Sequence, residues 1–255
     1  MKTLYLDFEN GYKSLGSKED ICELFGYPML QYDTWSDFGS LLSKLYETAT
    51  VEAPVKIGNI IIPQSVTKWV PTNGTQLDVL VLDTMTELVK KFQRELAKDR
   101  NGKNTYKLTL PQWGEMKLRL DRILSIINSV PNSVICNVHG KLKEDNELGV
   151  LKVMPNIEGS TKEDLGKWFD FVLYTQVSKD SKGNRTYQWI TARDEKYCQA
   201  KDRSQELPKV MDQDYSIIFD IVKKKGWDGA KILVIGDPGS GKTMSLKTIK
   251  GVNNA

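Results

Sequence analysis

The chain has 255 residues, 40% hydrophobic and 27% charged, which suits one large domain or two small ones with an ample core. The net charge of +3 is compatible with a nucleic-acid partner but does not require one. The three cysteines are far apart and form no C-x-x-C pair, which argues against a disulfide framework or a zinc site and for a reduced, cytoplasmic setting. No apolar run reaches the length of a membrane span, and residues 1–3 lead straight into a strand rather than a signal peptide.

The N-terminal part of the chain predicts a strand, two helices and a β-rich insertion. Residues 3–9 form an apolar strand that ends in acids and runs into a turn. Ser17 predicts the cap of a short helix, and Ser36 predicts the cap of a second, amphipathic helix. Residues 51–76 resemble an inserted strand pair, because β-branched residues alternate there with turn-forming residues.

The remaining chain alternates buried strands with amphipathic helices. Strands are predicted over residues 77–83, 133–139, 169–177, 187–192 and 231–235, and helices over 84–98, 112–130 and 215–222. Residues 99–111 and 140–165 are charged and predicted to be irregular, and residues 223–229 form a linker. This alternation predicts a single α/β domain over 1–255 with a mostly parallel central sheet.

A phosphate-binding loop follows the last predicted strand. Residues 236–243 read G-D-P-G-S-G-K-T, which matches the P-loop pattern G-x-x-x-x-G-K-[ST] between a strand and a helix. Its glycines let backbone N–H groups surround a phosphate, and the helix adds its positive N-terminal dipole. We predict ATP and Mg²⁺ as cofactors, with the nucleotide held by Gly236, Asp237, Pro238, Gly239, Ser240, Gly241, Lys242, Thr243 and Met244. The alternative is a glycine-rich turn that fits the pattern by chance.

Carboxylates at strand ends are the candidates for metal binding and for general base catalysis. Asp83 ends an apolar strand and is predicted to hold Mg²⁺ together with the hydroxyl of Thr243, although it could simply cap the following helix. Hydrolysis also needs a carboxylate that orients a water. We favour Glu9 over Glu87, because a strand end faces the nucleotide crevice of such a sheet, whereas a residue inside a helix points away.

The only histidine, His139, closes the strand 133–139. In P-loop proteins the strand beside the P-loop strand carries a polar sensor of the γ-phosphate, and Asn137 or His139 is placed for that role. A hydrogen-bonded core histidine is the competing interpretation.

Several segments resemble the phage-encoded RecA-like ATPases, an AAA/RecA-type class of single-domain P-loop proteins associated with single-strand annealing and recombination. The resemblance rests on residues 4–11, 81–88, the strand that ends in His139, and Lys201-Asp202-Arg203. It implies a RecA-like fold, with Glu9 as the catalytic carboxylate and Asp83 as the Walker B acid. It also implies that Lys201 and Arg203 act in trans on the ATP site of a neighbouring subunit, within a ring or a filament. From composition alone, these two side chains would be ordinary solvated charges.

The order of the segments departs from that family, in which the P-loop strand and helix come first. Here residues 230–255 would complete the sheet from the C-terminal end, so the sequence resembles a circular permutant whose former ends are joined through 223–229. The alternatives are a P-loop that begins a truncated second domain, or one that completes a neighbour's site by swapping.

The resemblance further implies single-stranded DNA as a partner. Lys103, Lys107, Lys141, Lys143 and Lys152 lie in the two irregular segments and could meet phosphates, but acids stand among them. We therefore expect an ATPase that acts on single-stranded DNA. The rival functions are an ATPase that remodels or loads a protein partner, and a nucleotide-binding switch that does not hydrolyse ATP.

Overall fold

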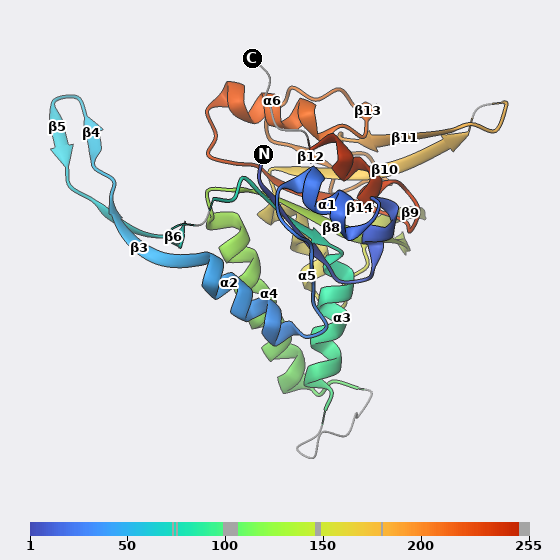
Figure 1. Ribbon diagram of the computed structural model, residues 1–255, viewed down its shortest axis with the longest axis horizontal. Coiled ribbons are helices and arrows are strands. Elements are labelled where there is room, and N and C mark those ends of the chain that lie inside the picture. The colour runs from blue at the N-terminus through green and yellow to red at the C-terminus, as the bar shows by residue number, and fades with distance from the viewer. Residues whose placement is uncertain (73, 75, 99–106, 146–148, 180, 250–255) are drawn as a thin grey trace.

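The computed structural model describes residues 1–72, 74, 76–98, 107–145, 149–179 and 181–249 (Figure 1). The strands are β1 (Thr3–Asp7), β2 (Leu30–Gln31), β3 (Tyr46–Glu52), β4 (Val55–Ile57), β5 (Ile60–Ile62), β6 (Ser65–Pro71), β7 (Val79–Asp83), β8 (Ser133–Asp145), β9 (Val150–Pro155), β10 (Phe171–Lys179), β11 (Arg185–Ile190), β12 (Lys201–Asp202), β13 (Val210–Asp212) and β14 (Lys231–Gly236). The helices are α1 (Lys18–Phe25), α2 (Trp35–Leu45), α3 (Met85–Leu96), α4 (Leu110–Ser129), α5 (Thr161–Asp164), α6 (Tyr215–Lys225) and α7 (Lys242–Ser245), with short 3₁₀ turns η1 (Gly11–Ser14), η2 (Leu165–Trp168) and η3 (Leu246–Thr248).

A central sheet runs in the order β13-β11-β10-β14-β8-β7-β1-β2. The pairs from β10 through β14, β8, β7 and β1 to β2 are all parallel, whereas β11 and β13 add an antiparallel edge. The predicted mostly parallel α/β sheet is therefore confirmed. Alternate residues of each strand point to opposite faces of the sheet, and both sets are apolar here. Helices therefore cover both faces.

The P-loop strand β14 is a central strand. It pairs with β8 from Lys231 opposite Val134 to Gly236 opposite His139, and on its other edge it pairs with β10. All six of its residues are buried. The prediction that the strand at 231–235 joins the same sheet beside 133–139 is confirmed.

Two apolar clusters fill the space between the sheet and its helices. The first cluster packs α2, α3 and α4 against residues such as Leu82 and Leu233. The second packs α1, α6 and the residues after the P-loop against the opposite face, through residues such as Val81 and Val234. Met1 packs against this second cluster, which also contains Ile249. A circular permutation predicts that Met1 and Ala255 lie close together, but Ala255 lies outside the described residues.

Three sequence predictions need correction. Residues 223–225 do not belong to a linker, because α6 continues to Lys225 and is capped by Gly226. The second helix begins at Trp35 with Thr34 as its N-cap, and not Ser36, because the Thr34 hydroxyl accepts from the N–H of Asp37. The segment at 140–165 is not irregular: β8 continues to Asp145 and pairs with β9 in an antiparallel ribbon. Charged side chains that suggested a solvated loop instead pair with one another across this ribbon and with a neighbouring helix. Of the segment at 99–111, residues 99–106 lie outside the described part of the chain.

The β-rich insertion forms an arm that projects from the body of the protein (Figure 1). β3 pairs with β6, and beyond them β4 pairs with β5, both antiparallel. The predicted strand pair is thus confirmed and is longer than expected, since β3 begins directly after α2. Among the described residues, no helix is both long enough and apolar enough to cross a membrane.

Candidate nucleotide-binding site

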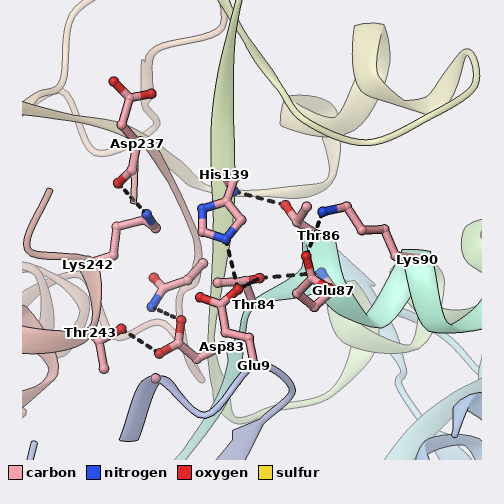
Figure 2. Close-up of polar contacts among 12 residues, drawn as sticks. Glu9, Asp83, Thr84, Thr86, Glu87, Lys90, His139, Asp237, Lys242 and Thr243 are labelled. Carbon is pink, nitrogen blue, oxygen red and sulfur yellow. Dashed lines mark hydrogen bonds and ion pairs between the residues drawn. The ribbon is translucent and has the colours of Figure 1, made fainter. Parts of the chain in front are cut away.

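The P-loop follows the carboxyl end of β14, and the side chain of Lys242 bonds back to the start of the loop. Nζ of Lys242 donates to the carbonyl oxygens of Gly236 and Asp237, at 2.8 and 2.9 Å (Figure 2). Gly239 and Gly241 have φ of 76° and 92°, a region that side-chain-bearing residues rarely adopt. A Cβ on Gly239 would meet nothing within 4 Å, so this part of the loop presents bare backbone to open space.

The predicted metal-binding acid lies directly against the P-loop. Asp83 is fully buried and accepts from the hydroxyl of Thr243 at 2.7 Å, from the Tyr5 hydroxyl at 2.9 Å and from Nδ2 of Asn137 at 3.0 Å. Burial raises the pKa of Asp83, and the three hydrogen bonds only partly offset that effect. A carboxylate in this state favours a cation beside it, and the oxygens of Asp83 and Thr243 are the hard donors that Mg²⁺ prefers.

Lys242 is the buried cation of the same site. Burial lowers its pKa, while the negative charges of Asp83, Glu9 and Asp237 act in the opposite direction. Among the described residues, its ammonium is bound by uncharged carbonyl oxygens alone, which phosphate oxygens could replace with stronger, charge-assisted hydrogen bonds.

A cavity of about 680 Å³ opens beside the P-loop. Its volume suits a nucleotide-sized ligand. It is lined by residues from five parts of the chain: Glu9, Gly11, Ser14, His139, Arg185, Thr186, Tyr187, Asp212, Gln213, Pro238, Gly239, Gly241, Lys242, Thr243, Met244, Ser245 and Thr248. Near it, Oδ1 of Asn137 and Nδ1 of His139 are buried and have no hydrogen-bond partner within the described part of the chain. Unsatisfied polar atoms, bare glycine backbone and a buried lysine together fit ATP with Mg²⁺.

Glu9 and His139 meet at the edge of this cavity (Figure 2). Nε2 of His139 lies 2.9 Å from Oε2 of Glu9, and the Thr84 hydroxyl donates to the same oxygen at 3.3 Å. Burial alone would raise the pKa of Glu9, but the hydrogen bonds from His139 and Thr84 and the charge of Lys242 outweigh it and lower the pKa. These contacts favour the ionised form of Glu9, the form that a general base requires.

The rival carboxylate, Glu87, points elsewhere. It lies in the first turn of α3 and forms an ion pair of 2.6 Å with Lys90 (Figure 2). It does not line the cavity, whereas Glu9 does. The geometry accordingly favours Glu9, for the reason given from the sequence.

Asn137 and His139, the two sensor candidates, are both near the P-loop but make different contacts. Asn137 donates to Asp83, and His139 contacts Glu9 through its ring and Thr86 through its backbone N–H, at 2.9 Å. His139 lines the cavity directly. The candidate sensor is thus in contact with the candidate base. The two residues are 130 positions apart in the sequence, so no local sequence pattern could predict this contact.

Lys201 and Arg203 lie at the opposite end of the sheet from the P-loop. Arg203 pairs with Asp170 at 2.7 Å, and Nζ of Lys201 donates to the Phe169 carbonyl at 2.6 Å. The N–H of Asp170 donates to the carbonyl of Lys231, which begins β14, whereas the P-loop follows the far end of that strand. A strand of this length separates the two sites by roughly 15 Å. Within one chain, these cations therefore do not reach Lys242.

Sequence reasoning missed the residues that support the P-loop from behind. The Thr175 hydroxyl donates to the Ser240 hydroxyl at 2.7 Å, and Nε2 of Gln213 donates to the Ser240 carbonyl at 3.0 Å. Tyr5 likewise donates to Asp83 from within a strand, where its sequence predicts no role in the site. Each is an ordinary residue of its own segment, and only the sheet order brings it to the loop.

Comparison with known proteins identifies a family. The family model described as AAA domain matches residues 1–204, which include Glu9, Asp83, His139, Lys201 and Arg203. The P-loop at 236–243 lies outside the matched residues, so its assignment rests on its motif and on its contact with Asp83. No curated protein and no solved structure matches significantly. Because the match covers most of the chain and the P-loop lies against its Asp83, the chain belongs to the AAA domain family of P-loop ATPases.

Proposed function

We propose that the protein binds ATP with Mg²⁺ at residues 236–244 and hydrolyses it with Glu9 as the general base. The observation that supports this most directly is the 2.7 Å contact between Thr243 and Asp83, which unites the P-loop and the Walker B strand at one cavity. Lys242 would hold the phosphates, and Thr243 with Asp83 would hold Mg²⁺, which offsets phosphate charge when bound. Glu9 would accept the proton of the attacking water, and His139 would keep its carboxylate in place.

The first experiment measures ATP affinity and steady-state turnover of Lys242→Ala. We expect turnover to fall by about 100-fold or more, because the variant loses the cation that faces the transferred phosphoryl group. Lys247→Ala is the matched control, since Lys247 is a nearby exposed lysine that does not line the cavity. Near-normal binding and hydrolysis in Lys242→Ala would rule out this site.

We further propose that the ATPase acts on single-stranded DNA, on the strength of the resemblance to RecA-like ATPases. The described cations give this proposal modest support. Lys141 is exposed on the β8–β9 ribbon, but Lys143 pairs with Glu163 and Lys152 pairs with Asp145. Lys103 lies outside the described residues. Binding of labelled single strands across a salt series tests the proposal, because each phosphate that the protein neutralises steepens the salt dependence.

The arm supports the rival proposal of a protein partner. Val55, Ile57, Ile60 and Ile62 lie opposite one another in register and share one face of the β4–β5 ribbon, where all four are exposed. An uncovered apolar face of this kind is typical of protein contacts rather than of phosphate binding. A protein-directed ATPase would show no salt-dependent affinity for single strands, so the same titration separates the two functions.

We also propose that the protein self-associates into a ring or filament in which Lys201 and Arg203 act in trans. The resemblance supports this proposal; within their own chain Arg203 pairs with Asp170 and Lys201 donates to the carbonyl of Phe169, far from the P-loop. Finally, we propose that the segment order is a circular permutation of the RecA-like order. The support is the central position of β14, the last strand in sequence, between β10 and β8.

A further inference from the structure

The ribbon formed by β10 and β11 overhangs the P-loop. Tyr174 of β10 lies opposite Ile235, the residue before the first P-loop glycine, yet β10 continues to Lys179. Arg185, the first residue of β11, pairs with Lys179 at the far end of this extension. The ribbon therefore extends beyond the carboxyl end of β14, where the P-loop begins (Figure 1).

The ribbon is fixed against the loop by direct contacts. A Cβ on Gly241 would lie 2.9 Å from Cδ1 of Tyr187 and 2.5 Å from Oε1 of Gln213, so both side chains pack on the bare glycine backbone. Nε2 of Gln213 also donates to the Ser240 carbonyl at 3.0 Å and to the Gln188 carbonyl at 3.3 Å. These contacts set the position of β11 relative to the phosphate-binding backbone.

Arg185 lines the same cavity as Lys242 and Glu9. It lies two residues before Tyr187, so the two side chains are on the same face of β11, the face that contacts the P-loop. Within the described part of the chain, no ion pair or hydrogen bond of the guanidinium of Arg185 is seen, whereas Arg203 is paired with Asp170. The cavity therefore has a second cation whose charge no described carboxylate neutralises.

We infer that Arg185 binds the phosphate chain of the nucleotide in cis, as a second cation beside Lys242. A guanidinium offers N–H donors in a planar fork that suits phosphate oxygens, which a lysine ammonium does not reproduce. The inference rests on the proposed ATP site and adds a residue to it. It also gives each subunit a phosphate-binding arginine of its own, independent of any neighbour's Lys201 and Arg203.

The test compares the affinity of purified Arg185→Ala and Arg185→Lys for ATP, ADP and adenosine by calorimetry. We expect Arg185→Ala to bind ATP about tenfold more weakly or worse, Arg185→Lys to recover part of the loss, and adenosine affinity to stay unchanged. Lys179→Ala is the matched control: it removes the cation on the opposite strand of the same ribbon, and Lys179 does not line the cavity. Thermal unfolding of each variant checks that the ribbon remains folded.

The outcomes separate this inference from the proposed function. If the wild-type protein binds ATP and Lys242→Ala does not, but Arg185→Ala binds ATP normally, the inference on Arg185 is wrong and the ATP site stands. An equal loss of ATP and adenosine affinity would place Arg185 at the nucleoside instead and would also overturn it. A wild-type protein with no ATP affinity would overturn both the proposed function and the inference.

Discussion

Gly236 is the residue at which the P-loop is most sensitive to one added methyl group. It ends β14, and a Cβ built on it would lie 1.6 Å from Oγ1 of Thr175 and 2.8 Å from Oγ of Ser240. Ordinary contacts begin at 3.4 Å, and Cβ of Thr175 is itself only 2.8 Å away. A rotamer change of Thr175 cannot relieve the clash, so β10 or the P-loop must shift.

We therefore expect Gly236→Ala to destabilise the protein by about 2–4 kcal/mol. Overpacking a close-packed site costs roughly 1–3 kcal/mol. Loss of the hydrogen bond between Thr175 and Ser240, which the shift would break, adds roughly 1 kcal/mol. In a chain of this size, such a change lowers the melting temperature by about 5–15 °C. ATP affinity should fall as well, because the displaced loop no longer presents its backbone correctly.

Thermal and urea unfolding measure this effect. Gly114→Ala is the control, since Gly114 lies exposed in the interior of α4 and an added Cβ there meets nothing within 4 Å. It should stabilise the protein by about 0.5–1 kcal/mol. Combining Gly236→Ala with Thr175→Gly should be less destabilising than the sum of the two single changes. A Gly236→Ala variant as stable as the wild type would refute the reasoning.

Three further predictions address the base, the subunit contact and a buried lysine. Glu9→Gln should keep ATP affinity and lose turnover in a steady-state assay, whereas the reverse result, a loss only in Glu87→Gln, would show that the wrong carboxylate was chosen. Mixing Arg203→Ala with Lys242→Ala should restore some activity, because one kind of subunit junction then has both intact halves; activity that does not depend on concentration, from a monomer, would contradict this. Burial lowers the pKa of Lys231 to about 8. Above this pH the Lys231 side chain is mostly deprotonated in the folded protein but still protonated in the unfolded chain, so the free energy of unfolding rises with pH. Urea titrations should show a rise of about 1–2 kcal/mol from pH 8 to 9.5. Lys231→Met should lack this rise, and an equal slope in both proteins would contradict the assignment.

The sequence was sufficient to predict the central strands of the sheet and the P-loop motif, because their signals are local. Apolar β-branched runs that end in an acid or a glycine predicted β7, β8 and β14, and the P-loop motif needs only eight residues. The choice of Glu9 over Glu87 also followed from a local argument, that strand ends face the ligand and helix residues do not.

What the sequence could not predict depends on pairing between distant segments. The extension of β8 into a ribbon is concealed by charges that are exposed in one strand and paired with those of another element. The contact between His139 and Glu9, and the support of Ser240 by Thr175, depend on which strands become neighbours. The same holds for Arg185, which in sequence is one of several cations near a turn and becomes a cavity residue only because β11 lies beside the P-loop.

The proposed permutation leads to the last prediction, which concerns a rearranged chain that begins at Trp227, joins Ala255 to Met1 and ends at Gly226. Gly226 is exposed at the end of α6, and an added Cβ there meets nothing within 4 Å, so a break at this point costs few contacts. Met1 packs against the cluster that contains Ile249, so both residues lie on the same face of the sheet.

This variant should fold, melt within a few degrees of the wild type and bind ATP, because β14 keeps both of its neighbours whichever end of the chain supplies it. A second variant, opened between Val234 and Ile235, is the control. It divides a fully buried central strand and should not fold. If the first variant is insoluble, or if it folds without ATP affinity that the wild type possesses, the order of the segments matters to the site itself. The P-loop strand would then not be interchangeable as the first or the last strand of this sheet.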